Sequence, residues 1–341
     1  MEQQVVALDV GGANIKAASS TGRAQSIPFP LWRKPERLPH LLRPLLPEPS
    51  ETTAVLVTMT AELCDCFRTK RDGVLHVLNS VEEACRTRGI DAEHVRVWTR
   101  AGSFIPLPAA RQHPLEVAAA NWLATAWWVA ALYAQGTCLL VDTGSTTTDL
   151  TLIRDGRPVP QGLTDSERLL SRELVYVGVR RTPLPAVLDT VPFRGALCPI
   201  MAELFATSLD VFLVLEELPE RPDDHNTADG EPATREAAHA RLARLIGGDV
   251  ESVAYDEVVT IARHARTAIT DRIEHALDCQ WRRAGRLDRC VLTGEGEFLL
   301  ADILRRRMPQ VPIECLAERL GPEVSRAACA HAMIELWKKR G

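Results

Sequence analysis

Residues 5–14, VVALDVGGAN, and residues 137–149, TCLLVDTGSTTTD, decide the fold. In each stretch an apolar run typical of a buried strand ends in an aspartate, Asp9 or Asp142, and a glycine turn follows. The residues after each turn have the composition of a return strand, so each stretch predicts a β-hairpin. Two hairpins of one design, about 133 residues apart, indicate two domains that are built alike.

Segments typical of strands and of helices alternate through the rest of the chain, which favours the α/β class. Further strands are expected at residues 53–59, 95–98, 173–179, 288–292 and 311–315. Helices are expected at residues 38–46, 73–89, 199–215, 233–246, 256–283, 297–308 and 323–339. Residues 216–232 are acidic, polar and rich in proline, so an exposed loop is expected there.

The segment from Leu115 to Ala134 is apolar nearly throughout and has about the length of a membrane span. Glu116 and Asn121 interrupt it, alanines dilute it, and no basic flank sets an orientation. We therefore expect one buried core helix that begins near Pro114, and no membrane partner.

Composition limits the function classes. A chain of 341 residues with 46% hydrophobic and 25% charged residues is long enough for about two globular domains. Its 40 basic and 45 acidic residues give a net charge of −5, which argues against a broad nucleic-acid surface. Nine cysteines without framework spacing indicate reduced thiols, and the acidic start MEQQ is no signal peptide, so a cytoplasmic protein is expected.

The two turns have the chemistry of phosphate and metal binding. Glycines let backbone N–H groups approach an anion, and the preceding aspartate can hold Mg²⁺ directly or through water. One such turn alone is more often structural, but two in equivalent places favour phosphate binding. The candidate phosphate-binding residues here are Gly11, Gly12, Asn14, Gly144, Ser145, Thr146 and Thr147.

A third glycine turn lies in residues 291–298, VLTGEGEF. The pattern of strand, turn and helix places a helix N-terminus where an anion or nucleoside could bind, and it adds Gly294 and Gly296 to the candidates. Leu299 stands where the dinucleotide fingerprint needs its third glycine, and the chain has no P-loop motif.

Together the three turns resemble those of the acetate kinase, sugar kinase, Hsp70 and actin superfamily. The resemblance implies an α/β fold of two ribonuclease-H-like domains with a cleft between them. We expect the first domain at residues 1–135, with the closing helix 322–341 returning to it. The second is expected at residues 136–321, with a helical insertion and the exposed loop near 216–232.

Four further segments narrow the resemblance to the hydantoinase/oxoprolinase-related family that is linked to tetrahydromethanopterin one-carbon transfer. The segments are residues 59–70 (MTAELCDCFRTK), 119–124 (AANWLA), 173–183 (ELVYVGVRRTP) and 227–235 (TADGEPATR). Archaeal members make a methanofuran precursor. The resemblance implies a transferase that joins a furan-methanamine diphosphate to the phenol oxygen of a (glutamyl)tyramine and releases pyrophosphate.

The resemblance also implies roles for single residues. Asp9 and Asp142 would hold Mg²⁺ against the pyrophosphate, whose charge grows as the furfuryl C–O bond breaks. Arg180 and Arg181 follow a strand and suit a diphosphate clamp, although a solvated surface pair is an equal alternative.

Two more candidates follow the strand at residues 53–59. Glu62 is the candidate base for the phenol, with a structural carboxylate at a helix N-terminus as its alternative. Lys70 is a candidate substrate-binding residue.

The same turns leave two other functions open. One is an ATP-dependent kinase or a hydantoinase-like hydrolase, and the other is an actin-like ATP-binding reactivase that remodels a partner protein. The expected partners of the transferase are small-molecule diphosphate and phenol substrates, and the expected cofactor is Mg²⁺. Dimers are common in this superfamily, so a homodimer is left open.

Overall fold

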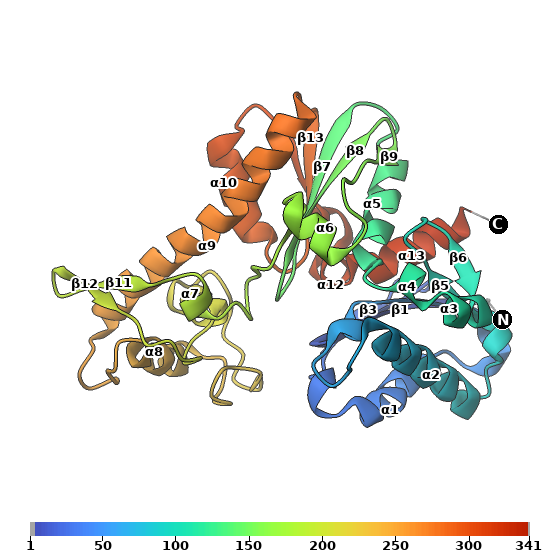
Figure 1. Cartoon of the computed structure of the whole chain (residues 1–341), viewed down its shortest axis with the longest axis horizontal. Helices are drawn as coiled ribbons and strands as arrows, with labels where there is room; N and C mark the ends of the chain where they lie inside the picture. The colour runs from blue at the N-terminus through green and yellow to red at the C-terminus, as the bar shows by residue number, and fades with distance from the viewer. Residues whose placement is uncertain (1–3, 340–341) are drawn as a thin grey trace. The chain divides into compact units, whose positions relative to one another are not determined.

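The computed structural model describes residues 4–339 (Figure 1). The chain forms two compact units. The first unit comprises residues 1–140, 151–171 and 314–341, and the second comprises residues 141–150 and 172–313. The predicted domains, residues 1–135 with the closing helix 322–341 and residues 136–321, stay predictions.

The first sheet has the strand order β3-β2-β1-β4-β5-β6. Strand β1 is antiparallel to β2 and parallel to β4, with Asp9 opposite Lys16 on one side and Thr58 on the other. A meander followed by parallel strands on the far side of β1 is the ribonuclease-H-like order, which confirms the predicted fold class. The strands are β1 (Gln4–Val10), β2 (Asn14–Ser19), β3 (Ala24–Pro28), β4 (Thr52–Met59), β5 (Val95–Trp98) and β6 (Phe104–Pro106).

Helices cover both faces of this sheet (Figure 1). Leu8 and Val57 face a core that is shared with α1 and α2, whereas Ala7 and Leu56 face α5 and α13. Successive strand residues thus bury opposite faces, as a pleated strand requires. The helices of this unit are α1 (Leu38–Leu42), α2 (Lys70–Arg88), α3 (Leu107–Gln112), α4 (Pro114–Val117), α5 (Asn121–Leu132), α6 (Asp165–Leu170), α11 (Leu316–Leu320), α12 (Pro322–Arg326) and α13 (Ala328–Lys338).

The apolar segment 115–134 is two helices, so the prediction of one long helix is wrong. Helix α4 ends at Val117, and Ala119 then adopts the left-handed region with φ 48°. Helix α5 begins at Asn121, whose side-chain oxygen accepts the Trp122 N–H at 2.8 Å. The indole of Trp122 donates to the Ala119 carbonyl at 3.0 Å and fixes the break. None of the helices within residues 4–339 is both long and apolar enough to cross a membrane.

The second sheet repeats the first arrangement, with the order β10-β8-β7-β13-β14 and β9 paired to β8. The hairpin strand β8 lies on one side of β7, and the later strands lie on the other side. The strands are β7 (Thr137–Thr143), β8 (Thr148–Arg154), β9 (Arg157–Pro158), β10 (Leu174–Val175), β13 (Arg289–Thr293) and β14 (Ile313–Cys315).

The second unit also contains a smaller helical part, which α9 connects to β13 (Figure 1). The helix predicted at residues 199–215 covers only α7 (Ser208–Val214), because Pro199 ends strand β12 and the capping box of Thr207 and Asp210 starts the helix later. The other elements are β11 (Thr190–Phe193), β12 (Ala196–Pro199), α8 (Arg235–Arg244), α9 (Tyr255–Ala284) and α10 (Glu297–Arg307).

Candidate active site

The first predicted phosphate turn lies between β1 and β2. Asp9 is 3% exposed near the end of β1, and the Gly11 N–H donates to the Asn14 carbonyl at 3.0 Å. A Cβ on Gly11 would lie 2.7 Å from that carbonyl oxygen, and a Cβ on Gly12 would lie 2.6 Å from the Cys64 sulfur. The turn therefore needs glycine at both positions for its close packing.

The second predicted turn, between β7 and β8, has the same construction. The Gly144 N–H donates to the Thr147 carbonyl at 2.9 Å, which matches the Gly11 contact in the first turn. Two turns with equivalent hydrogen bonds support the duplication inferred from the sequence. Each first glycine thus uses its N–H within its own turn.

Residues 177–181 pack directly on the second turn. The Val179 N–H donates to the Gly144 carbonyl at 3.1 Å, and the N–H groups of Arg180 and Arg181 donate to the Ser145 carbonyl at 3.1 and 2.9 Å. A Cβ on Gly178 would lie 2.5 Å from the Thr146 nitrogen. This glycine therefore allows a second stretch of backbone to lie against the turn.

The third glycine turn lies against the second one. The Gly296 N–H donates to the Thr143 carbonyl at 2.9 Å. Gly294 has φ 94°, and a Cβ there would lie 2.3 Å from the Thr143 oxygen and 2.6 Å from a carboxylate oxygen of Asp142. The structure thus brings Asp142 and the two later turns together in the second unit.

Arg180 holds two carboxylates beside these turns. Its guanidinium forms ion pairs with Asp224 and, at 3.3 Å, with Glu295, and its side chain is only 12% exposed. The alternative considered for Arg180 and Arg181, a solvated pair on the surface, therefore does not hold for Arg180. A diphosphate would have to compete with both carboxylates, whose positions beside Arg180 the sequence did not reveal. Arg181 is half-buried.

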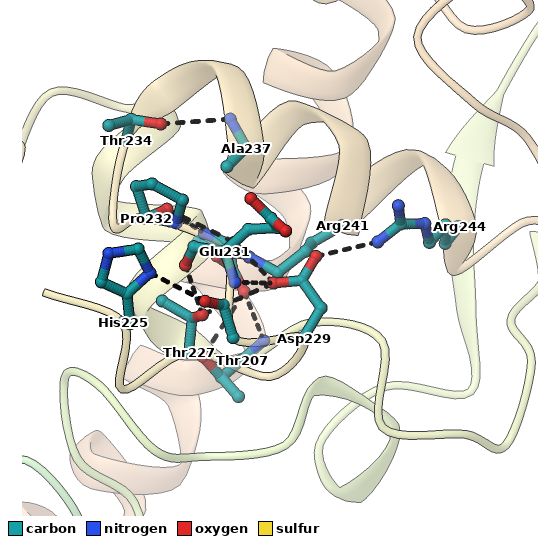
Figure 2. Close-up of polar contacts among 12 residues, drawn as sticks. Thr207, His225, Thr227, Asp229, Glu231, Pro232, Thr234, Ala237, Arg241 and Arg244 are labelled. Atoms are coloured by element: carbon teal, nitrogen blue, oxygen red, sulfur yellow. Dashed lines mark hydrogen bonds and ion pairs between the residues drawn. The ribbon is translucent and has the colours of Figure 1, made fainter. Parts of the chain in front are cut away.

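The acidic loop 216–232 is anchored by arginines (Figure 2). Asp229 lies between Arg241, whose Nη1 is at 3.0 Å, and Arg244, whose Nη1 is at 2.9 Å. Arg241 is fully buried and also donates to Asp210 at 2.6 Å. Within the loop the Thr227 hydroxyl donates to the Glu231 carbonyl at 2.6 Å. These contacts fix the loop that carries Asp224 to Arg180.

Glu62 is a buried carboxylate. It follows β4 in the short 3₁₀ helix η5 (Ala61–Leu63), is 1% exposed, and neither carboxylate oxygen has a hydrogen-bond partner among residues 4–339. The pKa of Glu62 is raised to about 7, mainly by burial; the nearby charge of Asp165 contributes to the rise and that of Lys70 opposes it. The amides of Glu62 itself and of Ala119 favour the charged form without reaching hydrogen-bond geometry.

Helix α2 fixes the position of Glu62. A Cβ on Gly73 would lie 2.4 Å from the Glu62 carbonyl oxygen, so the glycine lets the helix pack on η5. Thr69 and Asp72 form a capping box, which makes Lys70 the first helical residue. The Lys70 ammonium lies 3.4 Å from an Asp165 carboxylate oxygen. The structure thus brings Glu62 and Lys70 together and adds Asp165.

Asp165 was missed because it lies about 100 residues from Glu62 in the chain. Its local signal is the capping box of Thr164 and Glu167, which marks the start of α6. That signal predicts a helix start and carries no information on which side chain lies beside it.

Comparisons with known proteins place the chain in a family. The family model described as Hydantoinase/oxoprolinase matches residues 53–333. The chain belongs to the hydantoinase/oxoprolinase family. It is similar to the (4-{4-[2-(γ-L-glutamylamino)ethyl]phenoxymethyl}furan-2-yl)methanamine synthase of Methanocaldococcus jannaschii, with 34% identity over 343 residues that cover 100% of this chain and 99% of that protein.

Two other matches are a second relative from an archaeon and a solved structure. The protein of the same name from Methanococcus vannielii is 34% identical over 203 residues, which cover 59% of this chain and 90% of that protein. A solved structure of a non-polymerisable quadruple mutant of pCBH ParM has 13% identity and a TM-score of 0.49, and the match covers 99% of this chain and 100% of that one.

The segments that carried the family resemblance lie at these turns and anchors. Residues 59–70 contain Glu62 and the start of α2, and residues 119–124 form the helix break whose amide acts on Glu62. Residues 173–183 pack on the second turn, and residues 227–235 anchor the acidic loop. Each segment of this hydantoinase/oxoprolinase family member thus shapes one of the candidate binding regions.

The predicted magnesium ligands have suitable donor chemistry. Within residues 4–339 no group of three or more His, Cys, Asp or Glu side chains could hold a metal ion. Mg²⁺ usually takes one or two carboxylates and completes its shell with water and substrate phosphates. Asp9 and Asp142 are each one carboxylate beside a glycine turn, which is compatible with that mode of binding.

Proposed function

We propose that this protein is a transferase that joins a furan-methanamine diphosphate to the phenol oxygen of a (glutamyl)tyramine with release of pyrophosphate. The reaction would serve methanofuran-type cofactor biosynthesis in tetrahydromethanopterin-linked one-carbon metabolism. The single observation that carries the proposal is the 34% identity along the whole chain to a synthase whose name specifies a phenoxymethyl furan.

The reaction forms one bond and breaks one bond. The phenol oxygen bonds to the furfuryl CH₂ carbon, the bond between that carbon and the diphosphate oxygen breaks, and its electron pair leaves with pyrophosphate. The phenol proton passes to a base. The protein therefore has to accept a proton at one place and to stabilise growing negative charge at another.

Glu62 is the proposed base. Its carboxylate makes no hydrogen bond to any of residues 4–339, so a phenol O–H that reaches it would be its partner. A pKa of about 7 makes this carboxyl a stronger base than an ordinary glutamate, while a large fraction is still ionised at neutral pH. Lys70, the first residue of α2, is proposed to contact the substrate.

The diphosphate is proposed to bind at the glycine turns. Asp9 and Asp142 would hold Mg²⁺, which when bound neutralises charge on the leaving pyrophosphate. The proposed donors to the phosphate oxygens are Gly11, Gly12, Asn14, Gly144, Ser145, Thr146, Thr147, Arg180, Arg181, Gly294 and Gly296. Among them, Arg180 would exchange a carboxylate partner for a phosphate oxygen, because its guanidinium pairs with Asp224 and Glu295.

We further propose that the enzyme acts in the cytoplasm on small molecules, without a nucleic-acid or membrane partner; a homodimer is one assembly to test. Isothermal titration with Mg-pyrophosphate and with Mg-ATP, side by side, tests the proposed substrate class. The transferase should bind pyrophosphate and should turn over without ATP. Tight ATP binding with no pyrophosphate binding would replace it with the kinase, hydrolase or reactivase function.

A further inference from the structure

A second carboxylate, Asp165, lies beside Glu62 and has no part in the proton transfer. Asp165 is the first residue of α6, but the helix does not need it as a cap. Glu167 accepts the N–H groups of Leu163 and Thr164 at 2.9 and 3.0 Å, and the Thr164 hydroxyl accepts the Glu167 N–H. The Asp165 carboxylate therefore remains available for another partner.

Asp165 forms an ion pair with the primary ammonium group of Lys70. The Lys70 Nζ lies 3.4 Å from Asp165 Oδ2, which is longer than the 2.7–2.9 Å of a good charge-assisted hydrogen bond. Both side chains can be reached from solvent, with Lys70 33% and Asp165 25% exposed. Exposed ion pairs of this kind contribute little to stability, so Lys70 can give way to a competing cation at small cost.

Glu62 supplies the second observation. Its carboxylate is almost fully buried, and both oxygens lack a hydrogen-bond partner, which is rare for a buried charged group. Glu62 packs against the helix that begins at Lys70, because a Cβ on Gly73 would lie 2.4 Å from the Glu62 carbonyl oxygen, and Lys70 in turn contacts Asp165. The buried Glu62 carboxylate can accept a hydrogen bond from a ligand. The Asp165 carboxylate can be reached from solvent and already binds the Lys70 ammonium. Together the two carboxylates form a site for a ligand that has an amine at one end.

We propose that Asp165 binds the primary ammonium of the furan substrate. The inference rests on the proposed function, in which the furan carries a methanamine group, as in the product name of the relatives. The amine and the reacting CH₂ stand at opposite ends of one rigid, planar ring. Fixing the ammonium on Asp165 therefore fixes the direction in which the reacting carbon is presented to the phenol that Glu62 deprotonates.

The test compares two diphosphates, [5-(aminomethyl)furan-3-yl]methyl diphosphate, whose substitution matches the product name of the relatives, and (5-methylfuran-3-yl)methyl diphosphate, which lacks the amine. The wild-type kcat/KM should be about 10- to 100-fold higher for the amine, the effect of one charge-assisted contact. Asp165→Asn should lose that preference, so that its kcat/KM values for the two diphosphates become equal; the ratio is compared because the charge of Asp165 also acts on Glu62, which serves both substrates. Glu116→Gln removes an exposed carboxylate of the same unit, 62% exposed, and should keep the wild-type preference.

The outcomes separate this inference from the proposed function. Product from both diphosphates in the wild type with no preference, or an unchanged preference in Asp165→Asn, overturns the ammonium subsite and leaves the transferase standing. No product from either diphosphate in the wild type refutes the transferase and the subsite with it. The wild-type comparison needs no variant, so the absence of a preference overturns the subsite even if Asp165→Asn does not fold.

Discussion

Replacing Glu62 with glutamine should change how stability depends on pH and at the same time abolish turnover. The wild-type side chain is buried with no hydrogen-bond partner, and its pKa is raised from 4.5 to about 7 by burial. The folded protein therefore holds a proton at Glu62 that the unfolded chain gives up at lower pH. Ionising this group at neutral pH destabilises the fold.

The magnitude follows from the size of the rise. Below pH 4.5 the Glu62 carboxyl is protonated in both the folded and the unfolded state and does not affect stability. The destabilisation of the folded state grows as the pH rises from 4.5 to about 7 and is constant at higher pH. At about 1.4 kcal/mol per pH unit, the full cost above pH 7 is about 3 kcal/mol, of which about 2–3 kcal/mol develops between pH 5 and 8. Glu62→Gln cannot ionise, so its stability should rise relative to wild type by that amount over this pH range.

Denaturant unfolding of wild type and Glu62→Gln at pH 5, 6, 7 and 8 measures the effect. Any fixed cost of burying the amide is the same at each pH, so only the pH-dependent difference is used. Glu116→Gln, which removes an exposed carboxylate, should follow wild type at each pH. Parallel stability curves for wild type and Glu62→Gln would refute the raised pKa, and full turnover by Glu62→Gln would refute its role as base.

Three further predictions concern the glycine turns and the anchored loop. Activity should be lost in EDTA and restored by Mg²⁺, and Asp9→Asn and Asp142→Asn should each lower kcat by at least about 10²-fold with the fold intact; full activity in chelator would contradict the metal role. Arg241→Met leaves a buried carboxylate without its partner and should lower the free energy of unfolding by about 3–5 kcal/mol. Arg244→Met, at a 45% exposed position on the same loop anchor, should cost less than about 1 kcal/mol, and equal losses would show that burial is not the cause. Gly178→Ala forces a Cβ to 2.5 Å from the Thr146 nitrogen, so Mg-pyrophosphate affinity by calorimetry should fall while the circular dichroism spectrum stays native; unchanged affinity would exclude this turn from the site.

The sequence predicted the parts of the fold whose causes are local. A buried strand, an aspartate and a glycine turn together predicted both hairpins, and the matching Gly11 and Gly144 hydrogen bonds confirm that they are built alike. The parts that depend on distant residues were not predicted. The apolar segment has helical composition throughout, and only the indole of Trp122 bonding back to Ala119 shows why the helix breaks there.

The same distinction between local and distant causes applies to the residues of the candidate site. Glu62 and Lys70 were candidates because they follow one strand, and the structure places them together. Asp165 comes from a separate helix and Asp224 from a loop whose composition indicates only exposure. Long-range ion pairs such as these depend on how elements pack, and a single sequence has no local signal for them.

The central claim is that the phenol oxygen attacks carbon and pyrophosphate leaves, and an oxygen label on the phenol tests it most directly. The wild-type enzyme is given furan-methanamine diphosphate, Mg²⁺ and glutamyltyramine that carries ¹⁸O in its phenol group, without ATP. Mass spectrometry should find the label in the ether product and unlabelled pyrophosphate in equal amount. Label in a phosphate ester, or product that forms only when ATP is added, would contradict the account.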